Sequence, residues 1–200
     1  MDKPASHIFP LIDPIRLRWS PVVYDDRPIE PEKIGSLLEA ARWAASSYND
    51  QPWSYIAATR RQPEAYQKLF SCLVEANQIW ANKADMLLLA VARLNSTRTG
   101  KPNRHALHDV GQANANLVLQ ATAMGLASHQ MAGFQPALAR EKFQIPEGFE
   151  PLTMLAIGYP GDLNQAVSEL KSRDQSPRQR RPLTDWVFTD AWGQTSPFVQ

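Results

Sequence analysis

Apolar residues recur between positions 31 and 45 at the spacing of a helix that buries one face. After Pro31, a residue favoured at the first helical position, the apolar positions follow at intervals of three and four: Ile34, Leu37, Leu38, Ala41, Ala44 and Ala45. Helices are also predicted over 64–80, about 108–124 and 136–143, and Gly125 is well placed to end the second of these three. The pattern therefore predicts four helices over this part of the chain.

Three shorter segments have the pattern of strands. Residues 54–59 form a short one, and the apolar runs at 86–92 and 151–159 lack alternation, as expected of strands buried on both faces. The polar stretch 96–105 is predicted as a loop. Because the strands are spread between more numerous helices, the pattern indicates an α+β or α/β fold with one central sheet.

Composition favours one globular domain over the whole chain, 1–200. Its 200 residues are 44% hydrophobic, and 21 basic against 20 acidic residues leave a net charge of +1, so no global field draws it to nucleic acid or to a membrane. The longest apolar run, 86–92, is far shorter than the ~20 residues that span a bilayer. No signal peptide is recognisable, and the single cysteine, Cys72, favours a reducing, cytoplasmic location.

Common catalytic signatures are missing from the sequence. It contains no GxSxG, P-loop or GxGxxG motif. His105 and His108 could share one helix face, but without a third ligand nearby we expect no metal site. Cys72, predicted within the helix 64–80, is expected to be an inert, buried thiol. The basic stretch 178–181 by itself is typical of a solvated surface, and nucleic-acid binding through it is disfavoured by the balanced charge.

Four short segments gain meaning when they are taken together. They are "RWS" at 18–20, "SSYNDQPW" at 46–53, "MAGF" at 131–134, and "IGYP" at 157–160 with "RQRRPL" following at 178–183. In this order and at these separations, from about residue 16 to residue 183, they resemble the nitroreductase family of FMN-dependent oxidoreductases. The resemblance implies an α+β fold, with a mostly antiparallel central sheet flanked by helices, in an intertwined homodimer.

FMN carries a dianionic phosphate, which prefers guanidinium groups and a hydroxyl as partners. Arg18, Ser20, Arg178 and Arg180 could supply these groups from both ends of the chain. The resemblance implies that they hold the phosphate and the neighbouring ribityl oxygens, with Trp19 contributing from between. In this interpretation the basic stretch near the carboxyl terminus is a clamp.

The loop "SSYNDQPW" is unusually rich in side-chain donors and acceptors. The resemblance implies that Ser46, Ser47 and Asn49 reach an FMN bound mainly by the other subunit, while Pro52 and Trp53 fix the loop against the core. The alternative is a capping loop whose polar side chains satisfy helix ends.

In the "MAGF" segment, Gly133 would let the backbone approach the flavin closely, and the N–H of Ala132 or Gly133 could donate to flavin N5. Hydride transfer at N5 requires no acid–base side chain, so no catalytic residue is assigned. Two positions depart from the family. Val22 and Trp80 stand where a basic residue is frequent, with Asn77 near the second, and these changes bear on redox tuning and substrate preference.

The resemblance implies an enzyme that uses NAD(P)H to reduce nitroaromatic, quinone or other electron-poor acceptors by a ping-pong mechanism. Alternatives are a flavoprotein of the same fold with other redox chemistry, such as desaturation or dehalogenation, and a non-enzymatic FMN carrier or redox sensor. From about residue 184 the tail is predicted to cover the partner subunit, or else its own core, with four large aromatics: Trp186, Phe188, Trp192 and Phe198.

Overall fold

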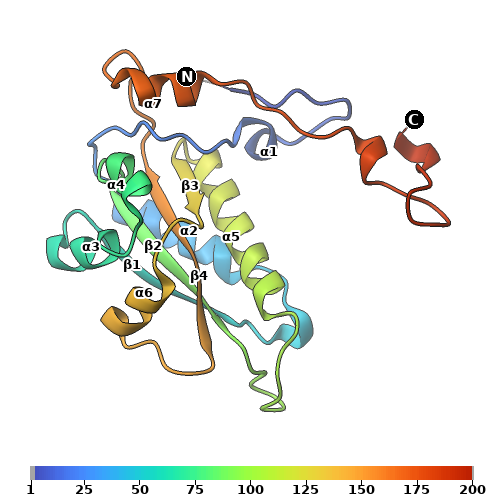
Figure 1. Cartoon of the computed structure of the whole chain (residues 1–200), viewed down its shortest axis with the longest axis horizontal. Helices are drawn as coiled ribbons and strands as arrows, with labels where there is room; N and C mark the ends of the chain where they lie inside the picture. Colours follow the sequence, from blue (N-terminus) through green and yellow to red (C-terminus); the bar gives the residue numbers. More distant parts are fainter. Residues whose placement is uncertain (1–2, 200) are drawn as a thin grey trace.

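The apolar run that follows residue 85 forms an inner strand of a four-stranded sheet. The computed structural model describes residues 3–199. In it, β2 (Met86–Arg93) pairs with β1 (Trp53–Thr59) on one side and with β4 (Phe149–Gly158) on the other, and β3 (Ala127–Met131) pairs with the far side of β4. All three pairings are antiparallel (Figure 1). The α+β class and the central antiparallel sheet are therefore confirmed.

β2 sends alternate side chains into two hydrophobic cores, one on each face of the sheet. Leu87, Leu89 and Val91 pack into the first core, as the two-residue period of a strand requires. This alternation explains why β2 is apolar throughout. Three helices cover that face: α3 (Pro63–Phe70), α4 (Glu75–Ala81) and α6 (Pro136–Phe143).

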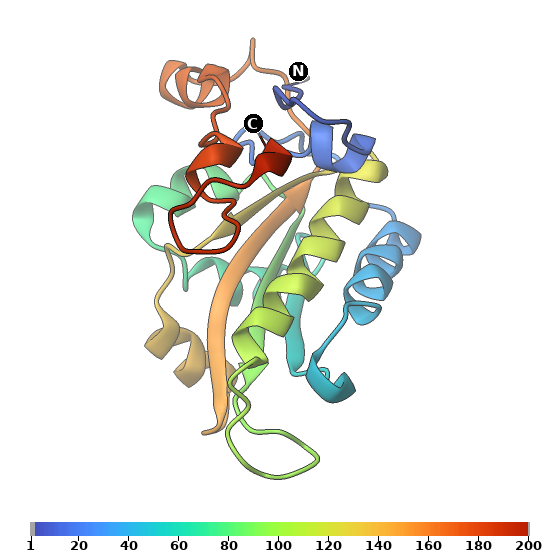
Figure 2. The ribbon, with the colours of Figure 1, turned by 90° about the vertical axis from the view of Figure 1, so that its right-hand side faces the viewer.

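The second core lies between the opposite face and two longer helices. Met86, Leu88 and Ala90 pack there against α2 (Pro31–Arg42) and α5 (Ala106–Ala123). Figure 2 shows the sheet between these two helix layers. The molecule is thus a three-layer sandwich whose middle layer is buried on both sides.

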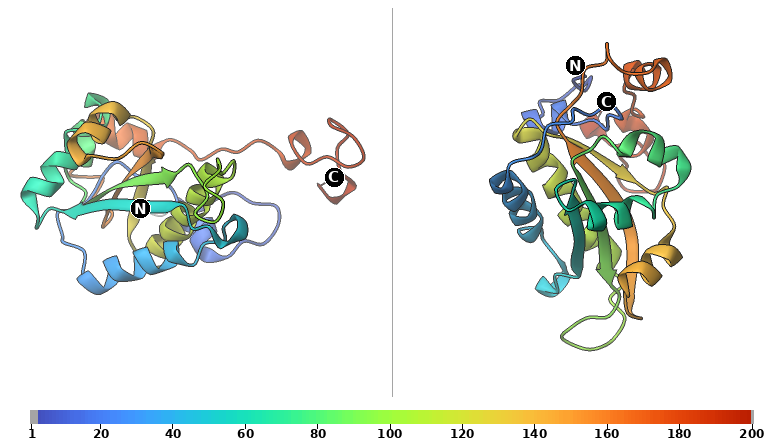
Figure 3. Two further views of the ribbon diagram at one scale, coloured as in Figure 1. Left: turned by 90° about the horizontal axis from the view of Figure 1, so that it is seen from below. Right: turned by 90° about the vertical axis from the view of Figure 1, so that its left-hand side faces the viewer.

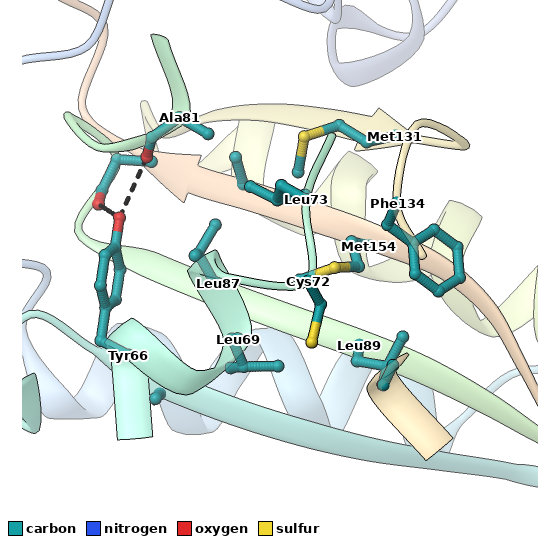
Figure 4. Packing of buried hydrophobic residues seen from close by; sticks show 14 of the residues in the cluster. Tyr66, Leu69, Cys72, Leu73, Ala81, Leu87, Leu89, Met131, Phe134 and Met154 are labelled. Atoms are coloured by element: carbon teal, nitrogen blue, oxygen red, sulfur yellow. Dashed lines mark hydrogen bonds between the residues drawn. The ribbon is translucent and has the colours of Figure 1, made fainter. Parts of the chain in front are cut away.

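Hydrogen bonds as well as apolar contacts tie the first helix layer together. The Tyr66 hydroxyl of α3 donates to the main-chain oxygens of Ala81 and Ala84, at 3.0 and 2.7 Å (Figure 4). Beside it, Leu69 packs close to Leu87 of β2. The end of α4 is therefore held on α3.

The prediction of one helix over 64–80 is wrong, because the chain breaks between α3 and α4. In the break Leu73 forms a β-bridge with Phe134, and the Val74 N–H donates to the Gly133 oxygen at 3.1 Å. Cys72 therefore lies after α3 and not inside a helix. It is buried, and burial raises the pKa of its thiol, as expected of an inert cysteine.

The other predicted elements are found close to their predicted positions. β1, β2, β4, α5 and α6 begin and end within two residues of the prediction, and α2 begins at Pro31. Gly125 has a φ of +73° just after α5, which glycine adopts without strain. Among the described residues, one strand and two α-helices were not predicted, β3, α1 (Asp13–Leu17) and α7 (Ser168–Gln175), nor were three short 3-10 helices at Ser47–Asn49, Leu183–Asp185 and Pro197–Val199.

The tail beyond α7 leaves the body of the protein. From Leu183 it extends away from the sheet and its helices (Figures 1 and 3). It folds on itself through a bridge between Phe188 and Thr195, with the rings of Phe188 and Trp192 5.2 Å apart. Trp192 and Phe198 are 94% and 81% exposed, so these aromatics do not cover the core of their own chain.

Within residues 3–199, none of the helices combines the length and the apolar character needed to cross a bilayer.

Candidate functional site

A pocket of about 310 Å³ lies where the segment after α1 meets α7 and the stretch that follows it. The amino-terminal segment meets the end of α7 here, because the Lys3 ammonium donates to the main-chain oxygens of Asp174 and Ser176, each at 2.6 Å. The pocket brings together five of the residues that the sequence nominated, and His129 of β3 joins them. The walls include Arg18, Trp19, Ser20, His129, Arg178 and Arg180.

Four guanidinium groups line this pocket: that of Arg173 and the three that the sequence predicted. Within residues 3–199, no carboxylate forms an ion pair with Arg18, Arg178 or Arg180. Burial lowers the pKa of Arg18, and the charges of Arg178 and Arg180 lower it further. Burial and the Arg180 charge likewise lower the pKa of Arg178. Such a cluster of like charges is stabilised when an anion enters it.

Arg18, Arg178 and Arg180 differ in the hydrogen bonds that they already make within the chain. Arg178 donates through Nη1 to the main-chain oxygen of Arg16 at 3.0 Å and to that of Lys3, so it ties the amino-terminal segment to the tail. Arg18 donates to the Ser20 hydroxyl at 3.3 Å, which keeps both groups together. Among the described residues, the Arg180 side chain donates only to the adjacent main chain, at the Gln179 oxygen 2.7 Å away. Arg18 and Arg180 are therefore better placed than Arg178 to bind an anion.

Asp174 also lines the pocket and was not predicted from the sequence as a site residue. Its carboxylate accepts hydrogen bonds from the Val22 N–H at 3.0 and 3.1 Å and from the Val23 N–H at 3.2 Å. Burial raises the pKa of Asp174, and these N–H donors oppose the rise. Since the Val22 side chain is only 1% exposed, a basic side chain at this position would have to be buried.

Three aromatic rings pack together on the core side of the pocket, and that of His129 lines it. His129 donates through Nδ1 to the Pro21 oxygen at 2.9 Å, and its ring lies 4.6 Å from that of Trp80. Burial is the main cause that lowers the pKa of His129. Trp80 also stacks on Tyr24, with ring centroids 6.2 Å apart. The Trp80 indole N–H is buried and has no hydrogen-bond partner in the described part of the chain.

Gly133 follows β3 at a point where no side chain fits. A Cβ there would lie 2.6 Å from the Asn77 amide nitrogen and 3.0 Å from a methyl group of Val74. Asn77 in turn donates to the Gly133 oxygen at 2.9 Å. In the region that the structure describes, neither the Ala132 N–H nor the Gly133 N–H donates a hydrogen bond. Both are therefore available to an acceptor.

The loop that carries Ser46, Ser47 and Asn49 does not join the pocket within one chain. The Ser47 N–H donates to Oδ2 of Asp109, in the first turn of α5, at 3.0 Å. β3, which carries the pocket residue His129, lies near the opposite end of this 18-residue helix, about 27 Å long (Figure 1). Among residues 3–199, α2 and α5 have no side-chain cap from this loop, and the Ser46 hydroxyl instead accepts from the Gln51 N–H within the loop itself.

The loop backbone is strained. Tyr48, Asn49 and Gln51 have φ values of +53°, +56° and +45°, which residues other than glycine adopt at a cost. Asp50, between them, is buried. Such strain is typical of loops that bind a ligand or a partner.

His129 and Asp174 could not be found from local sequence signals. His129 lies on the strand that was not predicted, and Asp174 lies in a polar stretch that resembles any exposed helix. Across the described residues, no group of three or more His, Cys, Asp or Glu side chains is arranged to hold a metal ion.

Comparisons with known proteins agree with this architecture. The model of the nitroreductase family matches residues 15–86 and 61–159. An uncharacterized 15.4 kDa protein of Mycolicibacterium smegmatis is 34% identical over 133 residues, which cover 65% of this chain and 86% of that protein. The FMN reductase [NAD(P)H] of Bacillus subtilis is 26% identical over 156 residues, covering 70% of this chain and 61% of the relative.

Solved structures are similar to this chain over nearly its whole length. A crystal structure of an oxidoreductase containing FMN superposes with a TM-score of 0.88 at 32% identity and covers 95% of this chain and 96% of its own. A nitroreductase family protein of Clostridium difficile 630 has a TM-score of 0.70 at 26% identity, with 92% and 99% covered.

Proposed function

This chain belongs to the nitroreductase family, and from that premise we propose that it is an FMN-dependent oxidoreductase. It takes electrons from NAD(P)H and passes them to nitroaromatics, quinones or other electron-poor acceptors. The observation that carries the proposal is the convergence of Arg18, Arg178 and Arg180 around one pocket without an acidic partner among residues 3–199. The names of the FMN-containing structural relative and of the FMN reductase support the same cofactor and donor.

The donor set of the pocket fits the FMN phosphate. Arg18 and Arg180 supply guanidinium groups and Ser20 a hydroxyl, which are the partners a phosphate dianion prefers. Trp19, between the two amino-terminal ligands, would contact the neighbouring ribityl chain. When bound, FMN supplies hydride transfer at its N5 atom.

The remaining residues of the site are proposed to position the flavin ring and to bound the site on the core side. The free N–H groups of Ala132 and Gly133 are suited to orient the flavin ring at its N5 edge. The missing Cβ of Gly133 makes room for Asn77 and Val74, and the hydrogen bond from Asn77 to the Gly133 oxygen fixes the backbone there. His129 would bound the site on the core side, where its ring packs at a tilt against that of Trp80.

The complete site is proposed to need two copies of the chain. Ser46, Ser47 and Asn49 are held at the other end of α5 by the bond between Ser47 and Asp109, so they cannot reach the pocket of their own chain. In a homodimer the loop of one protomer would complete the site of its partner. The strained backbone at Tyr48 and Asn49 supports a binding role for this loop.

A ping-pong mechanism follows if both substrates use the same face of one flavin. The test begins with the purified protein, which should be yellow and should consume NAD(P)H steadily when a quinone or nitroaromatic is present. Double-reciprocal plots at several acceptor concentrations should give parallel lines. Intersecting lines would contradict the shared face, and a yellow protein that consumes no NAD(P)H would instead be a carrier or sensor.

A further inference from the structure

The loop between β2 and α5 carries a concentration of positive charge that the proposed site does not use. Arg98, Lys101 and Arg104 are exposed, and no acidic residue occurs from position 94 to position 108. In the described chain none of the three forms an ion pair. We call residues 95–104 the basic loop.

The basic loop is held in one shape by the carboxylate of Asp50. Asp50 accepts from the Thr97 N–H at 3.0 Å, from the Thr97 hydroxyl at 2.7 Å and from the Asn103 amide at 2.9 Å. Burial raises the pKa of Asp50, but the bonds from Thr97 and Asn103 and the charge of Arg93 outweigh it and leave the pKa below its ordinary value. The bridge between Asn95 and Pro102 closes the loop. Its cations are therefore presented from a fixed hairpin.

The Asp50 carboxylate also joins the basic loop to the loop 46–49, called here the cofactor loop because its residues are proposed to reach the partner's FMN. Asp50 follows Asn49 directly, and the Arg98 guanidinium lies 4.6 Å from the centroid of the Tyr48 ring. Tyr48 is 84% exposed, so the other face of its ring is open. If Ser46, Ser47 and Asn49 stand at the partner's flavin, the Tyr48 ring and the basic loop stand at the entrance to that site.

We propose that Arg98, Lys101 and Arg104 of this loop, with the Tyr48 ring, bind the phosphates and adenine of the electron donor and select NADPH over NADH. The inference rests on the proposed function, because it needs the cofactor loop to lie at the partner's flavin. NADPH differs from NADH by a 2′-phosphate monoester, which carries a charge of about −1.5 to −2 at neutral pH. Arginine forks are the usual partners of that group.

The donor fits this surface better than the acceptor does. NADPH carries a pyrophosphate and a 2′-phosphate, so it offers several anionic groups to three cations. Its adenine has a flat face that can stack on an exposed tyrosine. Quinones and most nitroaromatics carry no charge and would gain nothing from the basic loop.

The test is a triple variant, Arg98→Ala with Lys101→Ala and Arg104→Ala, which leaves Asp50 and its partners intact. We expect kcat/KM for NADPH to fall about 10- to 100-fold, since a hydrogen bond to a charged group is worth roughly a factor of ten or more. The value for NADH should fall only a few-fold, and that for a neutral quinone should not change. A matched control removes three lysines elsewhere: Lys68→Ala, Lys142→Ala and Lys171→Ala.

A second measurement uses the wild-type enzyme alone. The fragment 2′,5′-ADP should compete with NADPH at least tenfold more tightly than 5′-AMP, and added salt should weaken this difference. Equal inhibition by the two fragments, or equal losses for NADPH and NADH in the triple variant, would overturn the inference and leave the proposed function intact. A parallel loss for the quinone would assign the loop to the acceptor. A wild-type protein that binds no FMN would contradict both proposals.

Discussion

The two carboxylate oxygens of Asp174 lie 3.0 and 3.1 Å from the main-chain nitrogen of Val22, although 152 positions separate the residues. This contact joins α7 to the segment that carries Arg18 and Ser20. The proposed phosphate ligands from the two segments thus share one support. The buried Val22 side chain is part of that support, which gives a structural reason for its departure from the family's basic residue.

Replacement of Asp174 by Asn should loosen this support. The amide retains one acceptor oxygen, but the N–H groups of Val22 and Val23 can no longer both be satisfied by a charge. We expect a loss of about 1–3 kcal/mol in stability and FMN binding weakened up to about tenfold, with Glu147→Gln as the exposed control. Melting temperatures with and without FMN measure both effects. Unchanged melting and binding would show that the contact is dispensable.

The phosphate clamp predicts that Arg18→Ala and Arg180→Ala each weaken FMN binding by one to two orders of magnitude. A charged hydrogen bond is worth about 1.5–3 kcal/mol, which corresponds to that loss. Arg181→Ala is the matched control, because Arg181 is adjacent in sequence but does not line the pocket. Fluorescence titration of the apoprotein with FMN gives the dissociation constants. Retention of FMN by Arg18→Ala at wild-type strength would exclude the clamp.

The exposed tail predicts a joint loss of dimer and cofactor when the chain is cut after Leu183. Trp186, Trp192 and Phe198 are 52%, 94% and 81% exposed in one chain, so a partner subunit is the surface that they would cover. Size-exclusion chromatography should show more monomer, and the protein should elute colourless. The single variant Trp192→Ala should have a weaker effect in the same direction. A truncated protein that elutes as a yellow dimer would remove the tail from the interface.

The anchor at Asp50 predicts a pH-dependent stability difference. Because the pKa of Asp50 is below its ordinary value in the folded protein, its stabilising effect is complete above the unfolded-state pKa of about 3.9 and is lost as the pH falls through the folded value. Wild type should therefore melt above Asp50→Asn at pH 7, and the gap should narrow below about pH 4. Glu141→Gln serves as the exposed control. A gap of constant size from pH 7 to pH 3 would contradict the prediction.

Much of the fold could be predicted because its elements have strong local patterns. The unbroken apolar run of β2 indicated burial on both faces, and Pro31 and Gly125 marked the start of α2 and the end of α5. β3 had no such signal. Three of its five residues, ASHQM, are polar, and it becomes a strand because β4 offers a free edge. The break after α3 was also unpredictable, since Leu73 is drawn from helical to extended structure by Phe134, sixty-one positions away.

The sequence by itself determined which chemical groups are available: two arginine-containing segments, a hydroxyl- and amide-rich loop, and a glycine beside the flavin's expected edge. Only the tertiary structure decided how they are grouped. It brings Arg18 and Arg180 to one pocket, adds His129 and Asp174, and holds Ser46–Asn49 at the far end of α5. The physical reason is the separation in sequence over which each feature is decided. Helical and strand periodicity is a property of neighbouring residues, whereas the meeting of charges more than a hundred positions apart depends on how the whole sheet pairs and packs.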